Sequence, residues 1–355
     1  MQRALSLARR GWGRTAPNPM VGAVVVRGGR VVGEGAHRRF GGDHAEVEAL
    51  RKAGKRADGA SLYVTLEPCS HWGKTPPCTD AIIGAGIREV VCATRDPNPR
   101  AKGGAAVLRR AGIRVRFGLE RAEAEELNAA FFFAMRGGRA ARRPFVTLKL
   151  AVSADGSVAR RRNGSGVRTA ITGAPANREV HRMRAQHDAV AVGIGTALAD
   201  SPRLTVRLVR KPRIPPVRIV FDRTARIPLR SPLVRGARKA PTVVMAQTPS
   251  PDRELELFNA GVELVRARSL SAGLQALARQ GVTSLLVEGG PTLAAAFLRA
   301  RAVDRIVIFR SPRRLGRGAV AAFDDPSLLE KFRLVEQRRL GRDVMTVYDP
   351  TTRRA

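Results

Sequence analysis

The stretch EPCSHWGKTPPC, residues 67–78, contains two of the three cysteines of the chain, Cys69 and Cys78. An apolar, β-branched run at 61–66 predicts a strand before it, and residues 79–85 have the spacing of a helix. The two cysteines therefore lie at a strand-to-helix junction. Upstream, His44 stands at the start of another predicted helix, and Glu46 follows two residues later.

These residue types together predict a catalytic zinc site. One imidazole and two thiolates suit tetrahedral zinc and leave the fourth position open for water, whereas structural sites usually have four protein ligands. Zinc lowers the pKa of such a water to about 7. Zinc deaminases of nucleobases combine a His/Cys/Cys site with a glutamate that moves protons without binding the metal. We therefore predict His44, Cys69 and Cys78 as ligands of Zn2+ and Glu46 as the catalytic proton carrier.

Outward from this stretch, the chain alternates between strands and helices. Residues 136–143 are polar, contain a Gly pair and have no apolar periodicity, so we interpret them as a linker. Before the linker we predict helices at 1–10, 44–53, 79–85, 105–111 and 120–135, and strands at 21–27, 61–66, 89–93 and 113–117. After it we predict helices at 175–186, 271–279 and 292–299, and strands at 145–152, 188–192, 217–222, 242–246, 262–265, 284–287, 305–309, 333–336 and 344–348. The pattern indicates two α/β domains, 1–140 and 144–355.

Length and composition agree with this division. A chain of 355 residues favours two domains, and 44% hydrophobic residues suffice for ordinary cores. No uncharged apolar stretch reaches the roughly 18 residues of a membrane-spanning helix, and we find no signal-peptide core. Three cysteines are too few for a secreted disulfide scaffold, so we expect a cytoplasmic protein with free thiols. Cys92, inside a predicted strand, is interpreted as a small buried hydrophobe.

The formal net charge of +34 permits two interpretations. A basic surface can bind nucleic acid, but the excess can also reflect a general arginine bias. We favour the second because the arginines are scattered and aromatic residues, which stack on bases, make up only 5% of the chain. We therefore expect a small phosphorylated ligand rather than nucleic acid, and no membrane partner.

With PNPMVG at 17–22, HAE at 44–46 and DPNP at 96–99, the opening stretch resembles the deaminase half of the bifunctional riboflavin-biosynthesis deaminase/reductases. The resemblance implies a cytidine-deaminase-like zinc domain that hydrolyses the exocyclic amine of 2,5-diamino-6-hydroxy-4-(5-phosphoribosylamino)pyrimidine. Deaminases usually have two residues between their cysteines, whereas eight intervene here. The resemblance implies five substrate contacts: Asn18, His37, His71, Lys74 and Asn98. Asn18 and Asn98 can equally be turn residues, and His37 can be an exposed loop residue.

The second half carries glycines at two predicted strand-to-helix turns, GIGT at 193–196 and EGGPT at 288–292. Such turns let phosphate approach a helix N-terminus, although each motif alone can be a plain turn. With VTLKLAVSADG at 146–156, they resemble the family's reductase domain, which has a dihydrofolate-reductase-like α/β fold. That domain uses NADPH to reduce the ribosyl group of the deaminated product to ribityl. The resemblance implies that NADPH contacts Ala151, Thr196, Asp200, Gly290, Pro291, Thr292, Leu293, Ala294, Ala295 and Ala296. It implies that the substrate contacts Lys149, Arg184, Leu204, Arg207 and Glu288.

This chain departs from the family pattern in two places. Arg168-Thr169-Ala170 stands where the family usually has Ser-x-Trp, and Arg223 stands where a small hydroxyl residue is common. Loss of an aromatic platform costs on the order of 1 kcal/mol of stacking, so we expect weaker cofactor binding. Alternatively, Arg168 or Arg223 binds the 2′-phosphate of NADPH.

Two other functions fit parts of the sequence. A tRNA-type nucleic-acid deaminase with an accessory domain would use the basic charge, but it does not explain the second α/β pattern. A nucleic-acid-binding module with a structural zinc would need a fourth ligand that we do not find. We therefore predict the bifunctional enzyme, and we expect a homo-oligomer because the family commonly forms one.

Overall fold

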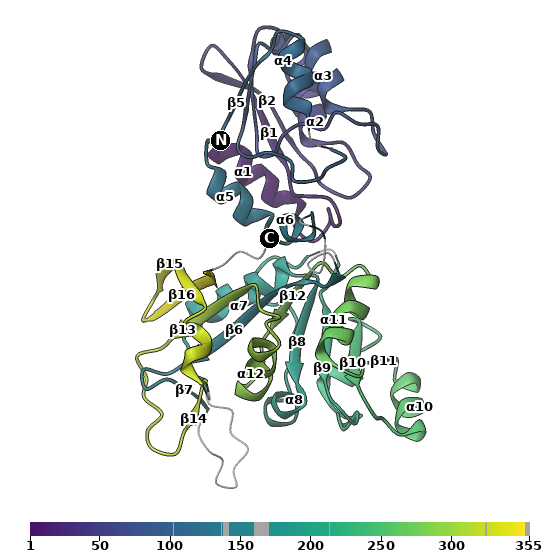
Figure 1. Cartoon of the computed structure of the whole chain (residues 1–355), viewed down its shortest axis with the longest axis vertical. Helices are drawn as coiled ribbons and strands as arrows, with labels where there is room; N and C mark the ends of the chain where they lie inside the picture. Colours follow the sequence, from purple (N-terminus) through teal and green to yellow (C-terminus); the bar gives the residue numbers. More distant parts are fainter. Residues whose placement is uncertain are drawn as a thin grey trace. The chain divides into compact units, whose positions relative to one another are not determined.

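The computed structural model describes residues 1–101, 103–135, 137, 142–159, 170–212, 214–323 and 325–351. The chain divides into two compact units, Met1–Ala141 and Arg142–Ala355 (Figure 1). Most of the linker predicted at 136–143 lies outside the described residues, as does Arg168. In the part of the chain that is described, no helix is long and apolar enough to cross a membrane.

The first unit contains a five-stranded sheet of order β2-β1-β3-β4-β5. Its strands are β1 (Gly22–Arg27), β2 (Arg30–Ala36), β3 (Ser61–Val64), β4 (Glu89–Cys92) and β5 (Arg114–Phe117). Strand β1 runs antiparallel to β2 and β3, whereas β3, β4 and β5 are parallel. The antiparallel hairpin partner β2 was not predicted, because two glycines interrupt its apolar pattern.

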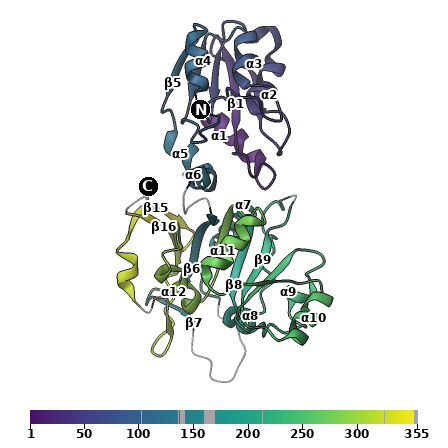
Figure 2. The same cartoon turned by 45° about the vertical axis from the view of Figure 1, so that its right-hand side comes forward.

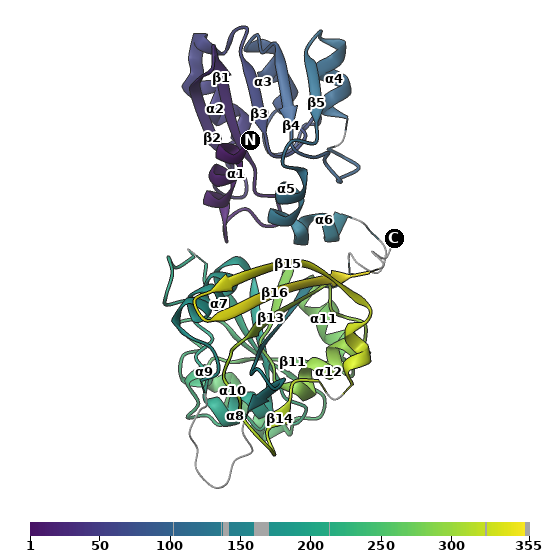
Figure 3. The same cartoon turned by 90° about the vertical axis from the view of Figure 1, so that its left-hand side faces the viewer.

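Helices cover both faces of this sheet (Figure 3). They are α1 (Gln2–Ala8), α2 (Ala45–Ala53), α3 (Cys78–Gly84), α4 (Gly104–Arg110), α5 (Arg121–Leu127) and α6 (Ala129–Met135), with short 3-10 turns at Arg9–Gly11 and Gly54–Ala57. Alternate residues of β1 point to opposite faces: Ala23 and Val25 pack with α2, α3 and α4, whereas Val24 packs with α1. Cys92 is fully buried in the larger cluster, as predicted.

The single helix predicted at 120–135 was wrong. Two helices, α5 and α6, meet at Asn128, whose backbone leaves the helical region with φ −113° and ψ 26°. The buried Asn128 side chain bonds to the main chain of Met20, accepting from its N–H at 2.8 Å and donating to its carbonyl at 2.9 Å. These two bonds tie the junction of α5 and α6 to a segment far away in the sequence, at the position where the helical backbone is interrupted.

The second unit is built on a nine-stranded sheet of order β11-β10-β9-β8-β12-β6-β13-β16-β15. These are β6 (Phe145–Val152), β8 (Ala189–Gly193), β9 (Val217–Phe221), β10 (Thr242–Ala246), β11 (Glu263–Arg266), β12 (Ser284–Val287), β13 (Arg305–Arg310), β15 (Phe332–Leu340) and β16 (Asp343–Pro350). Neighbouring strands are parallel from β11 to β13, and β16 and β15 add antiparallel. All nine predicted strand positions are confirmed.

The helices of this unit lie on the two faces of the sheet (Figure 2). Helices α11 (Leu270–Arg279) and α12 (Pro291–Arg299) pack in one core cluster. Helices α7 (Ala174–Gln186), α8 (Ile194–Asp200), α9 (Pro232–Arg235) and α10 (Pro251–Asn259) pack in the other. A separate two-stranded sheet pairs β7 (Ser157–Ala159) with β14 (Val320–Ala321). Helices α8, α9 and α10 and strands β7 and β14 are short and were not predicted.

Candidate functional site

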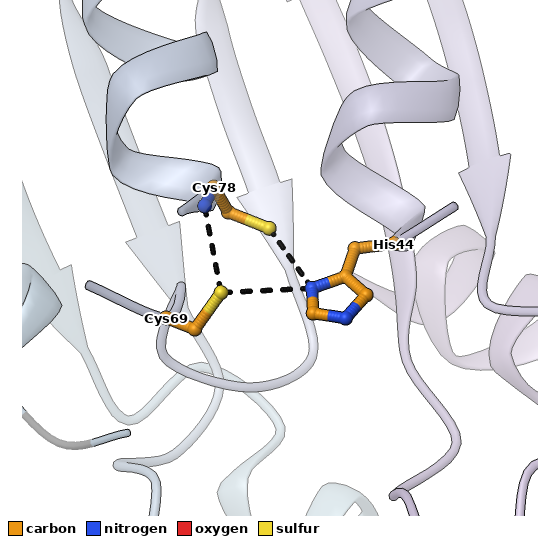
Figure 4. A group of neighbouring side chains, drawn as sticks. All are labelled: His44, Cys69 and Cys78. Carbon is orange, nitrogen blue, oxygen red and sulfur yellow. Dashed lines mark hydrogen bonds between the residues drawn. The ribbon is translucent and has the colours of Figure 1, made fainter. Parts of the chain in front are cut away.

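Three side chains from separate segments of the first unit meet at one point (Figure 4). His44 directly precedes α2, Cys78 is the first residue of α3, and Cys69 lies in the loop after β3. His44 Nδ1 lies 3.1 Å from Cys78 Sγ and 3.6 Å from Cys69 Sγ. The candidate ligand atoms all lie within 4.8 Å of one another. One nitrogen and two sulfurs at this separation fit a zinc ion.

Neighbouring groups orient these ligands and set their protonation. The main-chain N–H of Cys78 donates to Cys69 Sγ at 3.4 Å. Hydrogen bonding from Cys78, aided by His44, lowers the pKa of Cys69 to about 4. The bond to Cys69 and burial raise the pKa of Cys78 above its usual range. Thr75 Oγ1 lies 3.5 Å from His44 Nε2, so Nδ1 faces the sulfurs. The arrangement thus favours the thiolate form of Cys69, which is the form that metals bind, and the hydrogen bond with Cys69 raises the pKa of His44.

Glu46 lies in the first turn of α2 and lines the same cavity as His44 and Cys69. Its side chain is buried, and burial raises the pKa of its carboxyl group although His44 opposes the change. A carboxyl group with a raised pKa holds a proton closer to neutral pH and can both accept and donate it. Its position beside the ligand cluster is that expected of a proton carrier.

A cavity of about 190 Å³ opens beside this cluster. The five side chains predicted to contact substrate, from Asn18 to Asn98, all line it. His37 is 2% exposed, so the exposed-loop alternative was wrong. Its Nδ1 lies 3.0 Å from the carbonyl oxygen of Asp43, and its Nε2 lies 3.4 Å from Asn18 Nδ2. Asn18 and His37 therefore form one wall of the cavity.

The loop between the two cysteines supplies another part of the lining. His71 Nδ1 is buried and has no hydrogen-bond partner within the described part of the chain. Lys74 Nζ lies 4.1 Å from the ring centroid of Phe40, a cation–π contact. Asn98 lines the cavity and also has the turn role of the alternative prediction, because its Oδ1 accepts from the N–H of Arg100.

Several cavity residues were missed from the sequence. Glu67 accepts hydrogen bonds from the N–H groups of Ala105 at 3.0 Å and Asp96 at 3.3 Å. Burial raises the pKa of Asp96 to about 6. Both acids are the first residues of motifs that were noted, at 67–78 and 96–99, so a signal was available. Phe131 also lines the cavity, but it follows the motifs at long range and carries no local signal.

In the second unit, three predicted substrate residues come together. Lys149 of β6, Arg184 of α7 and Glu288, which follows β12, form a buried charge cluster. Arg184 Nη2 donates to Glu288 Oε2 at 2.9 Å, Arg184 Nε donates to Oε1, and Lys149 Nζ lies 3.8 Å from Oε2. Burial works to raise the pKa of Glu288, but Arg184 and Lys149 outweigh it and hold that pKa below its ordinary value.

The two other predicted substrate residues lie on the segment that follows α8. The N–H of Arg207 donates to His181 Nδ1 at 2.9 Å, and its Nη1 donates to Thr205 Oγ1 at 2.7 Å. Arg184 Nη1 donates to the Thr205 carbonyl at 3.2 Å, which ties this segment to the charge cluster. Leu204 is 2% exposed and packs in the core, with a φ of 51°.

Most of the predicted cofactor residues lie at the start and in the first half of α12, and Thr196 of α8 contacts its N-terminus. The N–H of Gly290 donates to Thr196 Oγ1 at 3.1 Å. Gly289 has no room for a side chain, because a Cβ there would lie 2.9 Å from Cβ of Leu293. Helix N-termini favour phosphate, so this junction is suited to a dinucleotide. Ala151 lies at the end of β6 and exposed Asp200 ends α8, whereas Ala294 and Ala295 are buried.

The two departures from the family pattern are partly visible. Ala170 is exposed, and its carbonyl accepts from Arg313 Nη1 at 2.6 Å. Arg223 is exposed directly after Asp222, at the carboxyl end of β9, and its carbonyl accepts from the N–H groups of Gln247 and Thr248.

Comparison with known proteins matches each unit to a family. Residues 1–94 match the cytidine and deoxycytidylate deaminase zinc-binding region, and residues 144–346 match the RibD C-terminal domain. The riboflavin biosynthesis protein RibD of Aquifex aeolicus is 41% identical over 354 residues, covering 98% of this chain and 97% of that protein.

Two solved structures resemble the whole chain. RibD of Acinetobacter baumannii has a TM-score of 0.82 at 38% identity, covering 99% of this chain and 98% of that one. A diaminohydroxyphosphoribosylaminopyrimidine deaminase/5-amino-6-(5-phosphoribosylamino)uracil reductase of Thermotoga maritima has a TM-score of 0.84 at 37% identity, covering 99% and 97%.

Proposed function

The chain belongs to the RibD family of bifunctional riboflavin-biosynthesis enzymes, and from this premise we propose how its own residues divide the two reactions. It is a zinc-dependent pyrimidine deaminase and an NADPH-dependent reductase. The match of 144–346 to the reductase domain sets aside the alternative of a tRNA-type deaminase and that of a binding module.

We assign the first reaction to residues 1–140. There the exocyclic amine of 2,5-diamino-6-hydroxy-4-(5-phosphoribosylamino)pyrimidine is replaced by oxygen from water, and ammonia leaves. His44, Cys69 and Cys78 hold the zinc ion, because their donor atoms already converge. When bound, zinc supplies a nucleophile near neutral pH by lowering the pKa of water to about 7.

Glu46 moves the protons that this exchange requires. Its carboxylate takes the proton that water gives up, and the resulting carboxyl group delivers a proton to the departing amine. Burial, which raises the pKa of Glu46, favours the protonated half of this cycle. The observation that carries the proposal is that Glu46 lines one cavity with His44 and Cys69, whose donor atoms converge with that of Cys78.

The remaining lining binds and orients the substrate. Asn18, His37 and Asn98 offer hydrogen bonds to the pyrimidine ring. His71 and Lys74, on the loop between the cysteines, are placed to contact the phosphate or a ring carbonyl. The unpartnered Nδ1 of His71 supports this role, because a buried polar nitrogen normally requires a hydrogen-bond partner.

We assign the second reaction to residues 144–355. NADPH supplies a hydride to C1 of the opened ribosyl group. Thr196, Asp200, Ala151 and the segment 290–296 hold the cofactor, although the side chains of Ala294 and Ala295 are buried in the core. Lys149, Arg184, Arg207 and Glu288 hold the substrate, and buried Leu204 contacts it through main chain.

The small phosphorylated pyrimidine is the partner that this site chemistry accommodates. We further propose that the protein works in the cytoplasm, where thiols such as Cys69 and Cys78 stay reduced. We also propose that it forms a homo-oligomer.

One experiment tests the central assignment. Purified protein is expected to contain about one zinc per chain and to release ammonia from the pyrimidine substrate. A Glu46→Gln variant is expected to keep its zinc and lose ammonia release. Release at the wild-type rate by Glu46→Gln would show that another group carries the protons.

A further inference from the structure

The wall of the deaminase cavity is held from outside by a residue that the catalytic assignment does not use. Asn128 lies between α5 and α6 and is 5% exposed. Its Oδ1 accepts from the N–H of Met20 at 2.8 Å, and its Nδ2 donates to the Met20 carbonyl at 2.9 Å. One side chain thus satisfies both main-chain groups of one residue, as a neighbouring strand would.

Met20 lies within the segment that forms the wall. Pro19 and Val21 on either side of it line the cavity, as does Asn18. The next residues are already fixed: His37 N–H donates to the Val21 carbonyl, and Gly22 N–H donates to Thr65 Oγ1. Asn128 supplies two further hydrogen bonds to Met20, so the main chain is also fixed before the start of β1, toward Asn18.

Asn128 also lies directly before α6 and bonds to its first turn. The Asn128 carbonyl accepts from the N–H of Phe132 at 2.9 Å, so α6 starts from it. Phe131, in the first turn of that helix, lines the cavity. A single buried amide is thereby connected to two parts of the lining, the 18–21 segment and Phe131.

We propose that Asn128 is a positioning residue of the deaminase, which holds the Asn18–Val21 wall and the start of α6 in register around the substrate. This inference rests on the deaminase function proposed above. Asn128 does not line the cavity and does not bind the metal. Its effect is therefore on substrate binding, with little effect on zinc content or on the chemical step.

The test compares Asn128→Leu, which has a similar shape and no polar atoms, with Asn128→Asp, which keeps the acceptor for the Met20 N–H. The full-length protein is used, with Val115→Ala on β5 as a control that loses core packing and leaves the cavity lining intact. The measurements are zinc per chain, deaminase KM and kcat, and hydrogen exchange of the Met20 amide.

We expect Asn128→Leu to raise KM by about tenfold, equivalent to about 1.4 kcal/mol, and to change kcat by less than about threefold. Zinc content stays unchanged, Met20 exchanges faster, and Asn128→Asp lies between Leu and wild type. An unchanged KM, or an equal rise in Val115→Ala at a matched melting temperature, overturns the proposal. Wild-type protein that releases no ammonia would instead refute the deaminase function itself.

Discussion

Arg184 and Glu288, from α7 and from the segment after β12, join through two parallel hydrogen bonds, with Nη2 2.9 Å from Oε2. Lys149 approaches the same carboxylate. Removing one partner of a buried ion pair leaves an uncompensated charge, which costs about 3–5 kcal/mol. We expect Glu288→Ala to destabilise the second unit by that order and to abolish the reductase, measured by calorimetry and NADPH oxidation. Retained ammonia release serves as the internal control, and an unshifted melting temperature would contradict the prediction.

Loss of a proposed zinc ligand is expected to stop the deaminase reaction and to leave the reductase reaction unchanged. Cys78→Ala removes one of the three proposed ligands and the thiol that hydrogen-bonds to Cys69. We expect less than one tenth of the wild-type zinc by metal analysis, since ligand loss at a three-ligand site weakens binding severely. Ammonia release stops while the reductase continues. Cys92→Ala, at a buried cysteine outside the cluster, is the matched control and keeps its zinc. Equal zinc in the two variants would exclude Cys78 as a ligand.

Replacing Asp96 by asparagine is expected to stabilise the protein in a pH-dependent way. Burial raises the pKa of Asp96 to about 6 in the folded protein, above its ordinary value of 3.8. The folded state therefore binds this proton more tightly than the unfolded state does. The stability that this tighter binding contributes is lost as the pH rises through about 6. At pH 7.5, Asp96→Asn removes a buried charge, and we expect a gain on the order of 1–2 kcal/mol. Denaturant titrations at pH 7.5 and pH 4 check this, because near pH 4 the gain should vanish. A gain of equal size at both pH values would contradict it.

Arg223 stands where the family commonly has a small hydroxyl residue, and replacing it tests whether it contributes to NADPH binding. Its exposed guanidinium lies at the carboxyl end of β9, one strand away from Thr196 on the helix after β8. If it binds the 2′-phosphate, Arg223→Ala lowers NADPH affinity by about tenfold, as expected for a lost charged hydrogen bond. NADH affinity stays the same. Exposed Arg279→Ala at the end of α11 is the control. Unchanged NADPH affinity by calorimetry would assign the phosphate to another group.

A side chain at Gly289 is expected not to fit at the turn that we propose binds NADPH. An added Cβ would lie 2.9 Å from Cβ of Leu293 and 2.8 Å from its Cδ2. We expect Gly289→Ala to displace the start of α12, to destabilise by about 1–3 kcal/mol and to weaken NADPH binding. Gly273→Ala on α11 is the control, because a Cβ there would come no closer than 3.5 Å to any neighbouring atom. Similar NADPH affinities for the two variants would argue against a close approach at Gly289.

The sequence predicted most of what is periodic or chemically unusual. Parallel strands such as β4 and β12 are buried on both faces, so their apolar runs were readily found. His44, Cys69 and Cys78 were identified because a thiol pair with an imidazole has few other uses at such junctions. The sequence gives no such signal for partners at long range, such as Met20 with Asn128 or Arg184 with Glu288.

Short helices were the main omission in the second unit. Helix α10 begins with Ser250 and Pro251, and the Ser250 side chain accepts from the N–H of Arg253. This serine-proline start is a recognisable capping signal that was present in the sequence. The break at Asn128 left no comparable mark, because the apolar spacing of 120–135 continues through it and the contact of Asn128 with Met20 joins residues far apart in the sequence.

Phe131 lines the deaminase cavity, although it lies well beyond residue 94, where the match to the deaminase zinc-binding region ends. A chimera that fuses this deaminase to a foreign reductase must therefore place its junction after Met135. A cut made directly after residue 94 would keep every proposed metal ligand and discard part of the cavity lining.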